Sequence, residues 1–204
     1  MKIIVSIAMI AVALAAPDLR AASPSHCGAV AGRDYTSSEN RAYLGIVEEY
    51  HFTPNIEALR SGNTGTIGGD LSYTLVQFPN HPRALAAFAN LSLRDKRLKP
   101  DGSRFSVECF FDRAIRFKPT DGMVRMVYGN YLMKAGQSDK ATEQLQMAAD
   151  LQPDNPTINY NLGLLYMQRK DYERARIYAK KAYELDFPLL GLKNQLIKAG
   201  KWEE

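Results

Sequence analysis

Two stretches of this chain decide its fold: Arg125-Met-Val-Tyr128-Gly129-Asn-Tyr-Leu132 and Asn159-Tyr-Asn-Leu162-Gly163-Leu-Leu-Tyr166. Their glycines are 34 residues apart, and other small residues recur at the same distance. At this distance Ala141 corresponds to Ala175, and Ala148 corresponds to Ala182. A fixed period of this length indicates an array of similar structural units that stack on one another.

Each unit has the pattern of two antiparallel helices. Gly129 and Ala141 are small enough to let two helices approach closely, while Leu132 and Leu145 belong to an apolar stripe at helical spacing. Pro153-Asp-Asn-Pro156 separates two units, because a proline ends one helix and begins the next. A single hairpin of this kind cannot bury its apolar face, so the units are expected to stack.

This pattern resembles the tetratricopeptide repeat, whose signature is W-x2-L-G-x2-Y followed by A-x3-F and a proline. The second copy matches the signature at Leu162, Gly163 and Tyr166. The tryptophan of the signature is replaced by Arg125 in one copy and by Asn159 in the other. The resemblance implies an all-α fold, an α-α superhelix of about three repeats with an N-terminal helical cap.

A third, more divergent copy precedes these two, with Phe88-Ala89 in place of Leu-Gly and a six-residue insertion within 95–102. We therefore expect a helical cap at 39–81, repeats at 82–121, 122–155 and 156–189, and a capping helix within 190–204. Inside the cap, helices are expected at 39–52, 54–60 and 70–78, with a glycine-rich turn at 61–69. In the divergent copy, helices are expected at 83–94 and 103–117.

The N-terminus has the features of an export signal. An uncharged apolar run, residues 3–16, follows Met1-Lys2. As a helix it would span about 21 Å, less than the roughly 30 Å of a bilayer core. Ala13-Leu-Ala15 has the small-x-small form of a signal-peptidase site. We expect a signal peptide at 1–15, a flexible arm at 16–38 and an exported chain, periplasmic or secreted and not inserted in the membrane. An uncleaved anchor is the alternative.

The net charge of +4 is mild for 204 residues. Basic residues alternate with acidic ones, as in Lys170-Asp-Tyr-Glu-Arg174. This arrangement is typical of a solvated helix face and not of a nucleic-acid-binding patch.

Cys27 and Cys109 are the two cysteines of the chain. In an oxidising compartment an isolated pair is usually a disulfide. This one would close a loop of about 80 residues and contribute on the order of 4 kcal/mol. A metal site that also used His26 would match no zinc spacing, so we expect no metal and no cofactor.

Arrays that resemble this chain hold a peptide or a partner helix on a concave face, which the first helix of each repeat lines. Transferred in register, this property predicts a partner-binding stripe. It consists of Asn90, Arg94, Met123, Met126, Asn130, Met133, Lys134, Tyr160, Leu164 and Met167. Methionine suits a surface that accepts varied apolar side chains. Methionines at this spacing also pack against the next repeat, and that alternative stays open.

Asn90 and Asn130 occupy equivalent places in adjacent repeats. An asparagine amide offers both a donor and an acceptor, which an extended peptide backbone requires. We therefore expect these two residues to act as backbone clamps. Met126 and Tyr160 stand where a clamp for a chaperone carboxylate would need cations, which argues against that kind of adaptor.

No catalytic constellation is apparent in the sequence, so we expect a protein that is not an enzyme. Two classes of function remain. The first is a scaffold that binds a protein or peptide segment in cell-envelope or secretion assembly. The second is a small-ligand carrier or enzyme with a pocket between the N-terminal cap and the repeats. Self-association through Trp202 is a further possibility.

Overall fold

The computed structural model describes residues 27–203, and every regular element in that span is a helix. The expected signal peptide at 1–15 lies outside the described residues. The elements in chain order are the 3-10 helix η1 (Ser38–Asn40), α1 (Arg41–His51), α2 (Pro54–Glu57), α3 (Ile67–Gln77), α4 (Pro82–Asp95), α5 (Val107–Phe117), α6 (Gly122–Lys134), α7 (Ser138–Leu151), α8 (Pro156–Gln168), α9 (Tyr172–Glu184) and α10 (Gly191–Lys198).

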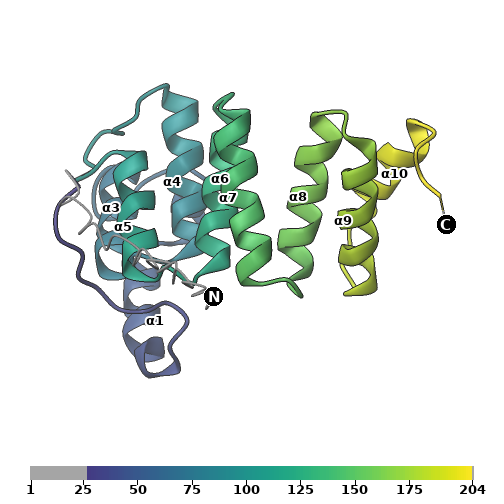
Figure 1. Ribbon diagram of the computed structural model, residues 1–204. Coiled ribbons are helices and arrows are strands. Elements are labelled where there is room, and N and C mark those ends of the chain that lie inside the picture. The colour runs from purple at the N-terminus through teal and green to yellow at the C-terminus, as the bar shows by residue number, and fades with distance from the viewer. Residues whose placement is uncertain (1–26, 204) are drawn as a thin grey trace, which may run out of the picture.

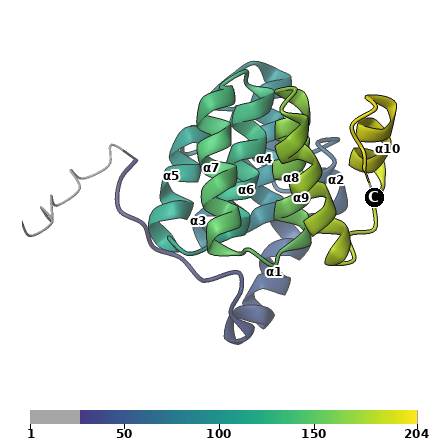
Figure 2. The ribbon, with the colours of Figure 1, turned by 45° about the vertical axis from the view of Figure 1, so that its right-hand side comes forward.

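The long helices form hairpins that stack in chain order. Helix α4 pairs with α5, α6 with α7 and α8 with α9, and the first helices of successive hairpins contact one another. Figure 1 shows the array running from α3 and α5 at one end to α10 at the other. Figure 2 shows α1 projecting from the body of this array. The fold is the all-α superhelix that the repeat pattern predicts.

A capped N-terminus begins each first helix. The side chains of His81, Asp121 and Asn155 accept hydrogen bonds from the first turns of α4, α6 and α8, respectively. Pro82 and Pro156 open α4 and α8, where the fixed φ of proline suits the first helical position. A cap of this kind stabilises a helix by about 1 kcal/mol. The caps therefore place the helix starts at the period read from the sequence.

In the second and third hairpins a glycine lies where the two helices approach most closely. A Cβ on Gly129 would lie 2.6 Å from Cγ of Leu145 and 3.2 Å from the carbonyl oxygen of Ala141. A Cβ on Gly163 would lie 3.3 Å from the carbonyl oxygen of Ala175. These distances are shorter than the roughly 3.5–4 Å of favourable carbon contacts. The backbone of each first helix therefore packs directly on the second helix of its hairpin.

In the first hairpin Ala89 stands at the place of the glycine, and the preceding residue contributes an aromatic ring to the contact between the two helices. Phe88 packs edge-on against Phe110, with ring centroids 4.8 Å apart. Helix α5 begins at Val107, and the expected start at Ser103 is wrong. The Ser103 hydroxyl donates to the carbonyl oxygen of Pro100 and closes a turn, so this residue belongs to the insertion.

A second expected boundary, the start of the third helix in the N-terminal cap, is also wrong. The glycine-rich segment 61–69 was expected to be a turn throughout, but α3 begins at Ile67. The Thr66 hydroxyl oxygen accepts a hydrogen bond from the first turn of the helix. Gly68 is buried in that turn, and a Cβ there would lie 2.3 Å from the carbonyl oxygen of Asp101. The absence of a side chain at this position therefore lets α3 lie close to the insertion.

A buried asparagine joins the N-terminal cap to the repeats. The Asn80 Nδ2 donates to Asp34 Oδ1 at 2.8 Å and to Asp121 Oδ2 at 3.0 Å, and its Oδ1 accepts from the N–H of Tyr35 at 2.9 Å. Burial by itself raises the pKa of Asp34, but hydrogen bonds from Lys118 and Asn80 outweigh it, so this pKa lies below its usual value. The carboxylate of Asp34 therefore stays charged.

The arm before η1 is held against the helices over its described residues. Cys27 and Cys109 form a disulfide, which is compatible with the expected pairing and ties the arm to α5. Farther along, the N–H of Arg33 donates to the carbonyl oxygen of Gln77 at 2.8 Å, which places the arm beside the end of α3.

The C-terminal helix α10 covers the last hairpin. Leu192 and Leu196 are fully buried, and Cδ2 of Leu192 lies 2.6 Å from the position of a Cβ on Gly163. The Trp202 ring packs against Tyr183 with a centroid distance of 6.2 Å. None of the helices among residues 27–203 is long and apolar enough to cross a membrane.

We predict that Gly129→Ala destabilises the protein by about 1–3 kcal/mol, because the new methyl group overlaps Leu145 in a packed hairpin. Gly45→Ala in α1 is the matched control, since nothing lies within 4 Å of its Cβ position. That control should be stabilised by roughly 0.5–1 kcal/mol. Urea unfolding measures both changes. Equal stabilisation of the two variants would contradict the close packing at Gly129.

A second prediction concerns pH. Burial lowers the pKa of His81 to about 4, although Glu48 opposes this shift. The unfolded chain takes up a proton near pH 6.5 and the folded chain does not, so stability is constant above that pH and falls below it. The expected loss between pH 7.5 and 5.5 is about 1.4 kcal/mol. His81→Asn should abolish this loss, because asparagine does not titrate. It should also keep the helix cap, because asparagine caps α8 at the equivalent position.

Urea unfolding at these two pH values tests the assignment. The carboxylates of Asp34, Glu57 and Asp70 do not titrate in this window, because their pKa values are lowered. An unchanged pH dependence in the variant would assign the effect to another group.

Candidate functional site

A hollow of about 170 Å³ lies between the first helices of the first two hairpins, α4 and α6. We call it the groove. Its lining residues are Ala86, Ala89, Asn90, Met126, Val127, Asn130, Tyr131 and Lys134. The groove is therefore the part of the predicted stripe that forms an open depression.

Four of the ten predicted stripe residues line the groove, namely Asn90, Met126, Asn130 and Lys134. The others lie elsewhere. Arg94 donates to the carbonyl oxygen of Leu59 and pairs with Asp95, and Met123 lines a separate hollow beside Lys118. Met133, Leu164 and Met167 are partly buried against the core. The alternative that these methionines pack within the array therefore accounts for Met133 and Met167.

The third hairpin does not continue the groove. Tyr160 is buried and stacks on Phe187 with ring centroids 4.2 Å apart. Its hydroxyl oxygen lies 2.9 Å from the position of a Cβ on Gly191. The segment that follows α9 therefore covers Tyr160, and the placement of this residue on an open stripe is corrected.

The two asparagines make different contacts within the protein. The Oδ1 of Asn90 accepts from Lys134 Nζ at 3.0 Å. The Nδ2 of Asn130 donates to Asn161 Oδ1 at 2.9 Å, and Asn161 in turn donates to the carbonyl oxygen of Thr157 at 2.8 Å. The bond to Thr157 fixes the amide of Asn161, and this amide fixes that of Asn130.

Each of these amides keeps one group unused among the described residues. Asn90 keeps its NH₂ donor, since it takes part only as the acceptor from Lys134. Asn130 keeps its Oδ1, which is buried and accepts no hydrogen bond from the described residues. A buried acceptor without a donor costs about 1–3 kcal/mol. The groove thus has one unused donor on α4 and one unused acceptor on α6.

The floor of the groove is apolar. Met126, Val127 and Tyr131 are all buried, with exposed fractions of 6%, 7% and 4%. Burial and the nearby Glu108 raise the pKa of Tyr131, while a hydrogen bond with Ser92 opposes them. The phenol therefore stays neutral, and Lys134 is the one charged residue among the eight that line the groove.

Sequence reasoning missed Val127, Tyr131 and Asn161. Val127 and Tyr131 follow Met126 and Asn130 by one position, so the hollow lies slightly farther around α6 than the predicted stripe. The spacing of four residues from Val127 to Tyr131, next to the predicted Met126 and Asn130, is a signal that could have identified them. Asn161 gives no such signal, because its role depends on a contact between repeats.

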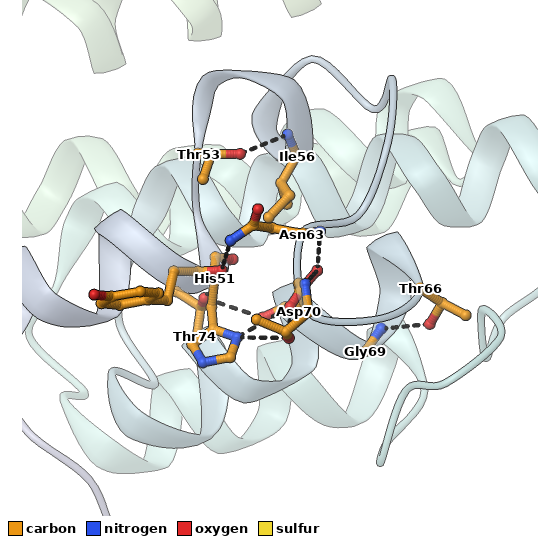
Figure 3. Close-up of polar contacts among 10 residues, drawn as sticks. His51, Thr53, Ile56, Asn63, Thr66, Gly69, Asp70 and Thr74 are labelled. Carbon is orange, nitrogen blue, oxygen red and sulfur yellow. Dashed lines mark hydrogen bonds and ion pairs between the residues drawn. The ribbon is translucent and has the colours of Figure 1, made fainter.

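A cluster in the N-terminal cap contains residue types found in hydrolases, namely His51, Asp70 and Thr64. Figure 3 shows His51 and Asn63 converging on Asp70. The Asp70 Oδ1 and Thr64 Oγ1 both contact the same ring nitrogen of His51, at 3.0 and 3.2 Å. A catalytic triad needs its nucleophile and its acid on opposite ring nitrogens.

The cluster instead fastens the loop before α3. Asp70 Oδ2 accepts from the backbone N–H groups of Asn63 and Thr64 at 2.8 and 3.2 Å. Burial by itself raises the pKa of Asp70, but hydrogen bonds from the Thr64 hydroxyl, the Asn63 N–H, His51 and the Thr64 N–H outweigh it, so the pKa is lowered. Among residues 27–203, no group of three or more His, Cys, Asp or Glu side chains could hold a metal ion.

Comparisons with known proteins agree with this architecture. Residues 129–186 match the family described as tetratricopeptide repeat. A solved structure entitled "Functional Characterization of Pseudomonas Aeruginosa pilF" is similar, with a TM-score of 0.54 and 21% identity over 79% of this chain and 69% of that chain. A structure of MamA from MSR-1 has a TM-score of 0.46 and 18% identity over 70% of this chain and 74% of that chain. No curated protein sequence matches the chain.

The likeness to the PilF structure concerns the fold, and the family match covers the second and third hairpins. The fold is one used by protein-interaction scaffolds. With its period of 34 residues, its glycine-closed hairpins and its stacked array, this chain has the fold of tetratricopeptide repeat arrays, and its residues 129–186 match that family.

Proposed function

We propose that this protein is an exported, non-enzymatic scaffold that holds an extended segment of a partner protein in the groove, in cell-envelope or secretion assembly. One observation carries the proposal. The groove has an unused amide donor on Asn90 and an unused buried acceptor on Asn130. A peptide unit contains one acceptor and one donor, so an extended segment lying between α4 and α6 can satisfy both amides.

The composition of the groove suits a segment that is recognised by its backbone. Met126 can adapt its shape to different side chains, and Ala86 and Ala89 leave room above the apolar floor. Lys134 already bonds to Asn90, so charge contributes little to selection. We therefore expect moderate affinity and tolerance of several partner sequences.

Two features support export. A disulfide joins Cys27 to Cys109, and such bonds persist mainly in oxidising compartments. The apolar run at 3–16 ends in a small-x-small site, which is the form of a cleavable signal peptide.

The alternative function, a carrier or enzyme with a pocket between the cap and the repeats, has less support. A hollow of about 210 Å³ does lie there, beside Thr66 and Arg94. However, Arg94 is paired with Asp95 at 2.8 Å and also donates to the carbonyl oxygen of Leu59. Asp101, which also lines this hollow, pairs with Arg97. The three charged residues that line it are therefore all engaged in ion pairs within the protein.

The groove predicts a specific loss of binding. The double variant Asn90→Ala/Asn130→Ala should capture its partner from an envelope fraction about tenfold less well than the wild type, since two hydrogen bonds are removed. Asn194→Ala is the matched control, because Asn194 is exposed on α10 and outside the groove. Quantitative mass spectrometry of the captured proteins provides the measurement.

Ala86→Phe separates binding from folding, because this change fills the groove and leaves both asparagines in place. It should lose the same partner while its urea midpoint stays near that of the wild type. Undiminished capture by both groove variants would move the binding surface elsewhere, and the absence of any captured protein would contradict the scaffold function.

A further inference from the structure

A second hollow, of about 390 Å³, lies away from the groove, between the arm and helices α3 and α5. We call it the arginine pocket. Its lining residues are Gly28, Ala29, Ala31, Val76, Arg104, Phe105 and Arg113. A neighbouring hollow of about 380 Å³ shares Val76 and Arg104 with it and continues along α3 past Tyr73. Together they form an open channel beside α3.

Arg113 is the most unusual group in the arginine pocket. It is 5% exposed, yet its guanidinium makes no ion pair with the described residues. Its Nη1 donates to the carbonyl oxygens of Cys27 and Ala29, and its Nε is buried with no acceptor among the described residues. A buried guanidinium without a carboxylate partner is costly, because it has lost its hydration without gaining a counter-charge.

Arg104 brings a second guanidinium to the same pocket. Its backbone N–H donates to Ser72 Oγ at 2.9 Å, which anchors the residue without using its side chain. The side chain is exposed and makes no ion pair with the described residues. The guanidinium carbons of Arg104 and Arg113 lie 5.3 and 4.4 Å from the ring centroid of Phe105. The two cations therefore flank one aromatic ring.

The charges around the pocket do not balance. Arg116 is neutralised by Asp112, whose Oδ2 lies 2.7 and 2.9 Å from its Nη2 and Nε. Burial lowers the pKa of Arg113, Arg116 and Arg104 lower it further, and Asp112 opposes them. These four groups carry three positive charges and one negative charge. An anion entering the pocket would therefore meet two cations that form no ion pair with residues 27–203.

We propose that the arginine pocket binds an acidic segment of a partner protein, with an aspartate or glutamate carboxylate held between Arg104 and Arg113. A guanidinium presents donors in a planar fork that matches both oxygens of a carboxylate. Arg113 Nε supplies a donor that has no acceptor among residues 27–203. The carboxylate also provides a counter-charge that no described residue gives this guanidinium in an ion pair.

The walls of the pocket select a peptide over a free inorganic anion. Ala29, Ala31, Val76 and Phe105 offer apolar surface beside the arginines, and inorganic phosphate could not use this surface. The channel beyond Arg104 gives the neighbouring peptide residues room to continue along α3. The disulfide holds this site together, because Cys109 and Arg113 lie one turn apart on α5 and both bind the arm.

The test uses the protein purified with its disulfide intact and labelled with ¹⁵N. The probes are the peptide acetyl-Ala-Glu-Val-amide, its glutamine counterpart and inorganic phosphate. The Nε–Hε resonances of Arg104 and Arg113 report directly on the pocket. We expect the glutamate peptide to shift both resonances to saturation, and the glutamine peptide to bind at least about tenfold more weakly.

Arg104→Gln should weaken the glutamate peptide at least about fivefold, and this change keeps the backbone bond to Ser72. Arg97→Gln removes the same charge from the same connecting segment but outside the pocket, and it should leave the affinity unchanged. Equal binding of the two peptides, no shift of Arg113, or tighter binding of phosphate than of the glutamate peptide would each overturn the proposal. The groove variants should bind the peptide normally, so the two sites are tested independently.

Discussion

The contact between Gly129 and α7 is the constraint from which the rest of the array follows. With 2.6 Å between a Cβ on Gly129 and Cγ of Leu145, only a glycine lets the two helix backbones lie this close. Gly163 repeats the contact one period later, against Ala175. The first helices of successive hairpins therefore lie side by side, because each hairpin must bury its remaining apolar face on the next one. The groove exists because α4 and α6 are adjacent first helices, and its position is therefore a consequence of hairpin packing.

Features that repeat or act locally could be predicted from the sequence. The period and the proline-marked turns depend on neighbouring residues, and they locate the long helices to within a few positions. The errors occur where a distant contact decides the structure. Residues 61–69 contain enough glycine to suggest a turn, but Gly68 lies in the first turn of α3, where the absence of a Cβ leaves room for the carbonyl oxygen of Asp101, 33 residues away. Ser103 likewise lies outside α5, because its hydroxyl closes a turn in the insertion.

The same distinction applies to the candidate site. Register transfer between equivalent helices places Asn90, Met126, Asn130 and Lys134 at the groove. It fails for Tyr160, because Phe187, which follows α9 at the end of the third repeat, stacks on its ring. It also cannot reveal Asn161, whose amide orients that of Asn130 across two repeats. A periodic pattern therefore predicts which helix face is available, while contacts between repeats decide which part of that face stays open.

The groove and the arginine pocket would select partners by different physical means. In the groove, the unused groups are neutral amide atoms and the single cation is already bonded, so recognition depends on the peptide backbone and changes little with salt. In the arginine pocket, two guanidiniums that form no ion pair with residues 27–203 attract a carboxylate, and the exposed Arg104 makes that attraction sensitive to ionic strength. Because the arm forms one wall of this pocket, the site depends on the Cys27–Cys109 disulfide, whereas the groove lies on α4 and α6, which the disulfide does not join. Reducing conditions would therefore weaken the charged contact first and leave the backbone contact in place. A partner that used both surfaces would be held in full only where the disulfide persists.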